Sequence, residues 1–362
     1  MKCELPHLRI GGYEAKMPIV QGGMSVGISL DNLASAVANE GGIGVIGAAG
    51  IGMMEPDFDA NFREANKRAL KTVIRKTRSK TNGIVGVNIM VALTDFEELV
   101  ETAIDEKTDI LFLGAGLPLK VPIEEARKRS TAIVPIVSSA KAAKLIFDYW
   151  HRRYGDIPDG VVVEGPLAGG HLGFKKEQIE REEYQLERIL PEVIKVVRCF
   201  EELYSRKIPV IAAGGIFTGK DIRKYIEMGS AGVQMATRFV ATEECDASKE
   251  FKETYVRCTK KDLIIIDSPV GLPGRAINNH FLEEVNKGTK KPFVCPWKCL
   301  RTCDVVNSPY CIGSALINAK NGMLNDGFAF AGANAYRIHS ITTVKELMKE
   351  LVEDYRSTSS NS

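Results

Sequence analysis

Residues 160–174 read Gly-Val-Val-Val-Glu-Gly-Pro-Leu-Ala-Gly-Gly-His-Leu-Gly-Phe. A short apolar run, typical of a strand, leads here into a glycine-rich loop that carries one histidine, His171. Glycines let the backbone approach a flat ligand closely, and the imidazole can then face that ligand. For an isolated Gly-Gly-His, a turn with a solvated or structurally hydrogen-bonded histidine would be the favoured interpretation. The regular alternation of strands and helices around this loop favours a binding site.

Short apolar runs recur along the first two thirds of the chain and alternate with amphipathic helical patterns. The eight predicted strands are Met17–Gln21, Gly42–Gly47, Val85–Met90, Ile110–Gly114, Ile133–Val137, Gly160–Glu164, Val210–Ala213 and Gly232–Met235. These runs are compact rather than alternating, as expected for parallel strands buried on both faces. Eight such units predict an α/β fold, the TIM (β/α)8 barrel. A doubly wound open sheet is the weaker alternative, because no dinucleotide-binding glycine motif follows the first strand.

The predicted barrel spans residues 1–258 and includes a basic helical insertion at about 53–80, after the second strand. We expect residues 259–362 to form a C-terminal extension that packs on the barrel. Its stretch from Asp267 to Arg275 is rich in proline and glycine, which predicts an ordered loop over the barrel mouth. Arg275 is expected either to close over an anionic group or to lie at the surface.

The composition excludes several classes of partner. The 362 residues include 48 basic and 46 acidic side chains, a net charge of +2, which gives no reason to expect nucleic acid or an anionic membrane surface. The first residues, Met1–His7, contain no apolar core of signal-peptide length, and no apolar run reaches the length of a transmembrane helix. We therefore expect a cytoplasmic protein with reduced cysteines. The sequence leaves a homodimer open.

Ligands of a βα barrel bind at the carboxyl ends of its strands, so the residues that end or follow the predicted strands are the candidates. These residues are Gly22, Gly23, Met24, Asn88, Glu164, Gly169, Gly170, Gly214, Gly215, Gln234, Met235, Ala236 and Thr237. The glycine pair after strand seven and the segment after strand eight predict a phosphate site. FMN, a phosphate-tailed planar heterocycle, fits better than a dinucleotide because no adenosine-binding unit is visible.

Several of these motifs together resemble the nitronate monooxygenase family, formerly called 2-nitropropane dioxygenases. They are Gly22-Gly-Met-Ser25, Gly86-Val-Asn-Ile-Met90, Glu164-Gly-x-x-Ala-Gly-Gly-His171, and Ala213-Gly-Gly-Ile216 with Gln234-x-x-Thr237. The resemblance covers about residues 10–285. It implies a TIM barrel with FMN at its mouth and His171 beside the flavin ring as the catalytic residue. The chain departs from the family at Leu167, where many relatives have a glutamate, so any role of that carboxylate does not carry over.

The family also contains FMN-dependent enoyl-acyl-carrier-protein reductases, and the same site residues serve both reactions. We expect an FMN-dependent oxidoreductase that oxidises alkyl nitronates with O2. The alternative is an enoyl thioester reductase that consumes NADH or NADPH. A rival of another class is a flavin-free barrel, an isomerase or synthase that acts on a phosphorylated substrate.

Four cysteines lie close together near the C-terminal end. Cys295, Cys299 and Cys303 recur at every fourth residue, and Cys311 follows eight residues later. One hypothesis is an iron–sulfur cluster or a zinc site with four cysteine ligands, although the spacing matches neither the usual zinc pairs nor the ferredoxin runs. The other is a helix with three small thiols along one buried face. We therefore assign no metal from the sequence.

Overall fold

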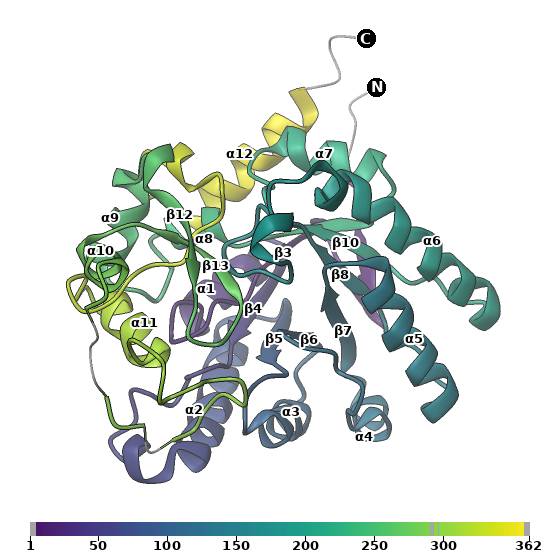
Figure 1. Ribbon diagram of the computed structural model, residues 1–362. Helices are drawn as coiled ribbons and strands as arrows, with labels where there is room; N and C mark the ends of the chain where they lie inside the picture. The colour runs from purple at the N-terminus through teal and green to yellow at the C-terminus, as the bar shows by residue number, and fades with distance from the viewer. Residues whose placement is uncertain (1–4, 290–292, 296, 358–362) are drawn as a thin grey trace.

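Eight parallel strands close into a barrel in the computed structural model, which describes residues 5–289, 293–295 and 297–357 (Figure 1). The strands are β3 (Ile19–Gln21), β4 (Ile43–Gly47), β5 (Ile84–Met90), β6 (Ile110–Gly114), β7 (Ala132–Val137), β8 (Val161–Glu164), β10 (Val210–Ala213) and β11 (Gly232–Met235). The predicted TIM barrel is confirmed. The largest difference in a strand boundary is at β3, which begins at Ile19 rather than at Met17.

The N-terminal hairpin closes one end of the barrel. Its strands are β1 (Leu8–Ile10) and β2 (Tyr13–Ala15), and Leu8 and Ile10 pack with inward-facing strand residues such as Val45 and Phe112. The Tyr13 hydroxyl donates a hydrogen bond to the Ser130 carbonyl, just before β7, at 2.8 Å. The hairpin therefore covers the amino ends of the strands, and the carboxyl ends carry the hollows described below.

Helices connect the successive strands and surround the barrel. They are α1 (Asp31–Asn39), α2 (Phe58–Lys80), α3 (Phe96–Asp105), α4 (Ile123–Lys128), α5 (Ala140–Tyr154), α6 (Leu186–Tyr204) and α7 (Gly219–Glu227). The helical stretch predicted as an insertion forms α2, which joins β4 to β5 and packs between α1 and α3. It therefore occupies the place of the second crossover helix of the barrel.

The C-terminal helix α12 (Val344–Ser357) completes the ring of helices, because it packs against α7 and α1 (Figure 1). The contact is close: a Cβ at Gly219 would lie 2.2 Å from the Leu351 carbonyl oxygen. The elements between β11 and α12 are α8 (Thr237–Val240), α9 (Lys249–Arg257), β12 (Leu263–Asp267), β13 (Pro273–Ile277), α10 (His280–Asn286) and α11 (Ile312–Lys320). The division of the chain at residue 258 stays a prediction, and the geometry groups α12 with the barrel.

The segment before α12 reaches back to the glycine loop that carries His171. Strands β12 and β13 form an antiparallel hairpin, and β13 also pairs with the two-residue strand β9 (Gly170–His171). In that pairing His171 lies opposite Gly274. The small sheet thus fixes the histidine loop to the C-terminal part of the chain. In the described part of the chain, no helix combines the length and apolar character needed to span a membrane.

Candidate active site

Two neighbouring hollows lie at the carboxyl ends of the barrel strands. The larger has a volume of about 310 Å³, and the smaller, of about 70 Å³, lies at the ends of β8, β10 and β11. Predicted site residues that line the larger cavity are Gly22, Gly23, Met24, Asn88, Glu164, Gly169, Gly170, His171, Gln234, Ala236 and Thr237. Those that line the smaller are Glu164, Gly169, Gly214, Gly215, Gln234, Met235, Ala236 and Thr237. Every residue predicted for the site therefore lines at least one of the two hollows.

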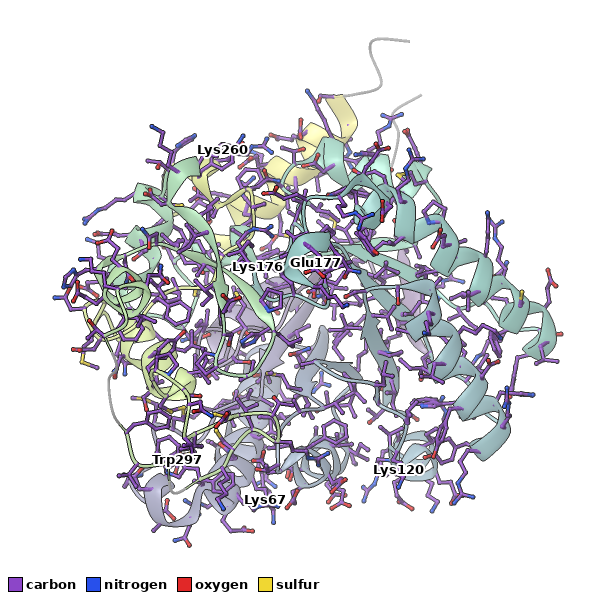
Figure 2. The ribbon with its side chains drawn as sticks, in the orientation of Figure 1. Lys67, Lys120, Lys176, Glu177, Lys260 and Trp297 are labelled. Carbon is purple, nitrogen blue, oxygen red and sulfur yellow. The ribbon has the colours of Figure 1, made fainter. Side chains whose placement is uncertain are left out.

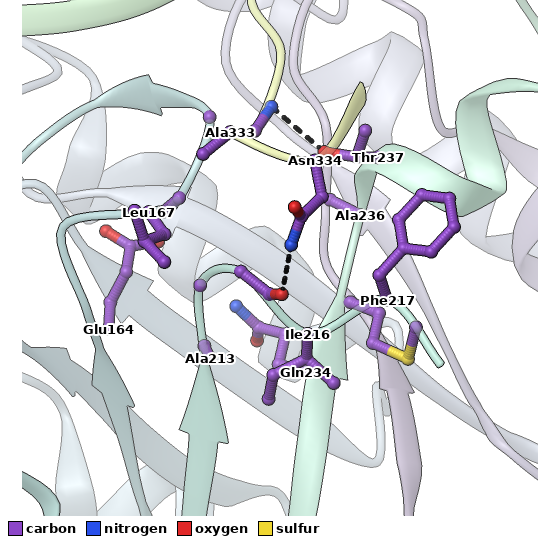
Figure 3. A pocket seen from close by; sticks show the side chains of 16 residues that line it. Glu164, Leu167, Ala213, Ile216, Phe217, Gln234, Ala236, Thr237, Ala333 and Asn334 are labelled. Atoms are coloured by element: carbon purple, nitrogen blue, oxygen red, sulfur yellow. Dashed lines mark hydrogen bonds between the residues drawn. The ribbon is translucent and has the colours of Figure 1, made fainter. Parts of the chain in front are cut away.

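Half of the 16 residues that line the smaller hollow are glycine or alanine, so backbone forms part of its wall (Figure 3). Gly214 and Gly215 have φ angles of 93° and 82°, in the left-handed region that favours glycine. A Cβ at Gly214 would lie 2.7 Å from the Gly165 carbonyl oxygen. Any side chain here would therefore strain the strand end, and the glycine pair leaves backbone groups to face a ligand.

The C-terminal part of the chain supplies a wall that the sequence did not indicate. The Gly332 N–H donates to Thr237 Oγ1 at 3.0 Å, and Asn334 Nδ2 donates to the Gly215 carbonyl at 2.6 Å (Figure 3). Gly332 and Asn334 lie about a hundred residues from the strand ends that they contact, so no local pattern could place them there. The Gly-Ala-Asn sequence at 332–334 was the one available signal of a tight turn.

Positive charge lies next to the smaller hollow. The guanidinium groups of Arg238 and Arg337 lie 4.5 Å and 4.4 Å from the centroid of the Phe217 ring, which lines the hollow. Arg238 also pairs with Glu350 at 2.8 Å. Glu350 offsets part of this charge, and the remaining positive charge would favour an anion nearby; the phosphate site stays a prediction.

Glycine also shapes the larger cavity. A Cβ at Gly23 would lie 2.5 Å from Asn88 Cβ, so only glycine lets the loop after β3 pass this side chain. The Asn88 amide nitrogen donates to the Phe112 carbonyl at 3.2 Å, which orients the amide at the cavity wall. Together, these residues form a narrow surface that suits a planar ligand.

His171 lies in the wall of the larger cavity and is held from two sides. Its Nε2 atom lies 2.7 Å from Ser268 Oγ, and its ring contacts the Phe330 ring edge-on at a centroid distance of 5.0 Å. Burial lowers the pKa of His171 to about 4, so the imidazole is neutral at pH 7. Ser268 lies in the stretch that the sequence marked as a mouth loop, but its contact with His171 was not predicted.

Glu164 ends β8 and lines both hollows. Burial raises the pKa of its carboxyl to about 7. Near neutral pH, a large fraction of Glu164 is therefore protonated. A neutral carboxylic acid can donate a hydrogen bond and does not repel an anion, so this residue is compatible with a neighbouring phosphate.

Arg275 braces the glycine loop, and the expectation that it lies at the surface was wrong. Its side chain donates to the carbonyls of Pro166 and Ala168 at 2.6 Å and 2.7 Å, and only 7% of the residue is exposed. Burial lowers its pKa to about 10, which still leaves it charged at neutral pH. The guanidinium therefore satisfies two carbonyls of the loop before His171 and is buried, while the expectation that it closes over an anionic group stays a prediction.

The lining away from the strand ends is mainly apolar, with Asn66 and Asp95 as its polar members. Its bulky side chains come from α2, the loop after β5 and the C-terminal part of the chain, and they include Phe58, Leu93, Trp297, Leu300, Leu316 and Phe330. Trp297 lies over α2 (Figure 2), with its ring 5.0 Å from the Phe58 ring. Cys299 lines the same wall. This half of the cavity therefore suits an apolar group of a substrate.

Comparison with known proteins shows which family this chain resembles. The family model of nitronate monooxygenase matches residues 8–354. A probable nitronate monooxygenase of Staphylococcus aureus is 25% identical, over 75% of this chain and 78% of its own. The (3aS,4S,5R,7aS)-5-hydroxy-7a-methyl-1-oxo-octahydro-1H-indene-4-carboxyl-CoA dehydrogenase of Mycobacterium tuberculosis is 26% identical, over 80% of this chain and 70% of its own.

A solved structure extends the similarity to almost the whole chain. FabK from Thermotoga maritima superposes with a TM-score of 0.73 and 28% identity, covering 94% of this chain and 93% of its own. The family match spans the barrel, the His171 loop and most of α12. The chain therefore belongs to the nitronate monooxygenase family of oxidoreductases.

Proposed function

We propose that the two hollows bind FMN, with the phosphate in the smaller and the flavin ring in the larger. The fit rests on the backbone walls at Gly214 and Gly215, the arginines beside Phe217, and the narrow surface at Gly23 and Asn88. A loop at the end of strands seven and eight is the usual phosphate position in this barrel. When bound, FMN supplies the capacity to accept electrons from one substrate and pass them to another.

We assign His171 as the residue that contacts the substrate beside the flavin. Ser268 engages Nε2 and fixes the ring, so we assign Nδ1 to the substrate. A serine hydroxyl can donate or accept, so it supports either neutral tautomer of the imidazole. With Nδ1 protonated, His171 donates a hydrogen bond to an oxygen of the anionic nitronate. With Nδ1 unprotonated, it accepts a proton from a neutral nitroalkane.

The proposed reaction is the oxidation of alkyl nitronates with O2. The observation that carries it is a buried, neutral imidazole in the cavity proposed to hold the flavin. Because the ring is neutral at pH 7, it can act as a hydrogen-bond donor or a base without a prior loss of a proton. O2 is small and needs no pocket of its own.

A second candidate is the reduction of an enoyl thioester by NADH or NADPH. The apolar wall at Trp297, Leu300 and Phe330 favours it, because a short nitronate would leave this surface unfilled. In that reaction His171 donates a hydrogen bond to the thioester carbonyl, or a proton to the product.

Anaerobic stopped-flow absorbance of the purified holoprotein separates the two candidates. Flavin bleaching by propyl-2-nitronate, with little response to NADH or NADPH, is expected for the proposed oxidase. Rapid bleaching by a nicotinamide, reversed by an enoyl thioester, would replace it with the reductase. A colourless protein that does not take up added FMN would contradict both.

The His171→Ala variant tests the role of the histidine. We expect it to retain FMN and to lose turnover by about 100-fold or more, as is typical when an acid–base group is removed. His339→Ala is the control, because His339 lies away from both hollows. Unchanged turnover in His171→Ala would contradict the assignment.

A further inference from the structure

A buried aspartate, Asp95, lies in the mainly apolar lining of the larger cavity together with Asn66. Only 1% of Asp95 and 4% of Asn66 is exposed. Asp159, the other buried aspartate in the described part of the chain, pairs with Arg127 and Arg206. The carboxylate of Asp95 instead accepts a hydrogen bond from a neutral amide, since Asn66 Nδ2 lies 2.7 Å from Asp95 Oδ2. A buried carboxylate is costly unless hydrogen bonds compensate it, so a further donor at Asp95 would be favourable.

Helix capping does not account for Asp95. The residue immediately precedes α3, where an aspartate ordinarily accepts a hydrogen bond from a backbone N–H of the first turn. The side chain of Asp95 makes no such bond to α3. Its carboxylate is turned toward Asn66 on the neighbouring helix α2. The position of Asp95 therefore calls for a different explanation.

The orientation of the Asn66 amide is fixed. Its Oδ1 atom accepts from the Gly52 N–H at 2.8 Å, so Nδ2 faces Asp95. A primary amide carries two N–H donors and a carboxylate carries two acceptor oxygens, and the bond between Asn66 and Asp95 uses one of each. The pair thus offers a ligand one N–H of Asn66 and the Oδ1 atom of Asp95. A hydroxyl group matches this arrangement because its oxygen both donates and accepts, whereas an ammonium group only donates.

The cysteine-rich segment supports the loop that carries Asp95. The Cys299 carbonyl accepts from the Thr94 N–H at 3.0 Å, next to Asp95. The described residues of the segment, 293–295 and 297–311, form no helix, so the expected helical face of three thiols is wrong. In the described part of the chain, no group of three His, Cys, Asp or Glu side chains is arranged to hold a metal. The contact that this segment makes here is one of backbone support.

The pair and His171 enter the cavity from different positions around the barrel. Asn66 lies on α2, between β4 and β5, and Asp95 follows β5, whereas His171 follows β8. Strands β6 and β7 separate β5 from β8 in the barrel. Phe58 on α2 and Leu93, two residues before Asp95, add apolar surface to the same lining. A ligand that reaches both His171 and the pair would therefore have an apolar body between its two ends.

We propose that Asp95 and Asn66 bind a hydroxyl group of the substrate and select substrates that carry this hydroxyl on an apolar body, away from the reacting group. The hydroxyl donates to Asp95 Oδ1 and accepts from the second N–H of Asn66 Nδ2. A site built to bind a hydroxyl rejects an analogue without one, because its buried polar groups then stay unpaired. The inference rests on the proposed function, since it takes the larger cavity as the substrate site.

The test compares the affinity of the full chain, with FMN added, for 1-hexanol and for its isomer 1-methoxypentane by isothermal titration calorimetry. The two ligands contain the same atoms, but the ether oxygen accepts and cannot donate. We expect the alcohol to bind about tenfold more tightly, as is typical of a hydrogen bond to a charged group. In Asp95→Asn we expect a ratio of about one, because the new amide accepts from Asn66 and presents an N–H that serves both ligands equally. Asp105→Asn, at the exposed end of α3, is the matched control and is expected to keep the wild-type ratio.

Equal affinity of the wild type for the two isomers, no binding of the alcohol, or an unchanged ratio in Asp95→Asn would overturn the proposal. If Asp95→Asn does not fold, Asn66→Ala replaces it, because the loss of the orienting amide is also expected to lower the ratio. If neither variant folds, the wild-type ratio decides. Failure of the proposed function would appear separately, as a protein that takes up no FMN or turns over neither nitronate nor enoyl thioester. The comparison of alcohol and ether involves no flavin reaction and is not affected by that outcome.

Discussion

The larger cavity has two walls that are built in different ways. One consists of strand ends and glycine loops of the barrel, where backbone groups and short side chains such as Asn88 face the cavity. The other consists of bulky side chains from α2 and the C-terminal part of the chain, including Trp297 and Phe330. A backbone wall can bind any planar ligand with a phosphate tail, whereas side chains can change without loss of the barrel. We infer that the first wall determines the cofactor and the second the substrate.

The largest effect is expected at the backbone wall, in Gly214→Ala. A residue with a side chain costs about 1–2 kcal/mol in the left-handed region. The new Cβ would also lie 2.7 Å from the Gly165 carbonyl, which cannot rotate away. We expect FMN binding to weaken by about 100-fold, equivalent to about 3 kcal/mol. The measurement is the Kd for FMN, obtained by flavin fluorescence with the deflavinated protein.

Gly271→Ala is the matched control. Gly271 has a φ of 79°, and a Cβ there meets nothing within 4 Å. The Gly271→Ala substitution therefore has a similar backbone cost, in the β12–β13 turn, but its new Cβ does not reach the smaller hollow. An equal loss of FMN affinity in both variants would mean that the backbone wall does not determine cofactor binding.

The second-largest effect is expected at Arg275 of β13, whose side chain holds the glycine loop before His171. Arg275→Met removes two hydrogen bonds to the carbonyls of Pro166 and Ala168 and leaves both acceptors buried. We expect a loss of about 2–3 kcal/mol in the free energy of unfolding, measured by urea denaturation. Arg257→Met is the control, because Arg257 is exposed and, within the described part of the chain, its one ion pair is with Glu253 on its own helix; a change below about 1 kcal/mol is expected. Equal effects would mean that Arg275 does not brace the loop.

The same contrast explains what could be predicted from the sequence. The barrel strands and their glycine ends follow local patterns, so the sequence predicts the eight strands and the strand-end residues that line both hollows. Ser268 and Asn334 contact the site across about a hundred residues, which no local pattern encodes. Helix α12 was placed in the extension for a related reason, since its contacts with α7 and α1 depend on the path of the intervening chain. The role of Arg275 also depends on which carbonyls surround it.

Glu164 and His171 are expected to make opposite contributions to the pH dependence of the free energy of unfolding. Glu164 has a raised pKa of about 7 against an ordinary value of 4.5, so the ligand-free protein loses stability as the pH rises from 4.5 to 7. His171 has a lowered pKa of about 4 against 6.5, so stability falls as the pH drops from 6.5 to 4.

Glu164→Gln is therefore expected to be more stable than the wild type at pH 8, and His171→Asn at pH 4.5. We expect each gain to be about 2 kcal/mol after allowance for partial solvent access. Urea denaturation of the ligand-free proteins at the two pH values is the measurement. Gains that do not depend on pH would show that packing, and not protonation, sets the difference.

The smallest effect is expected for Ser268→Ala, which removes the hydroxyl from His171 Nε2 but leaves the imidazole in the cavity. One neutral hydrogen bond contributes about 1 kcal/mol, so we expect turnover to fall about fivefold with FMN affinity unchanged. Ser79→Ala on the exposed side of α2 is the control. A positioning role also predicts a changed pH profile of turnover, because the hydroxyl no longer supports either tautomer of the ring. If Ser268→Ala lowered FMN affinity as strongly as Gly214→Ala, the C-terminal wall would also determine cofactor binding, and the division between the two walls would fail.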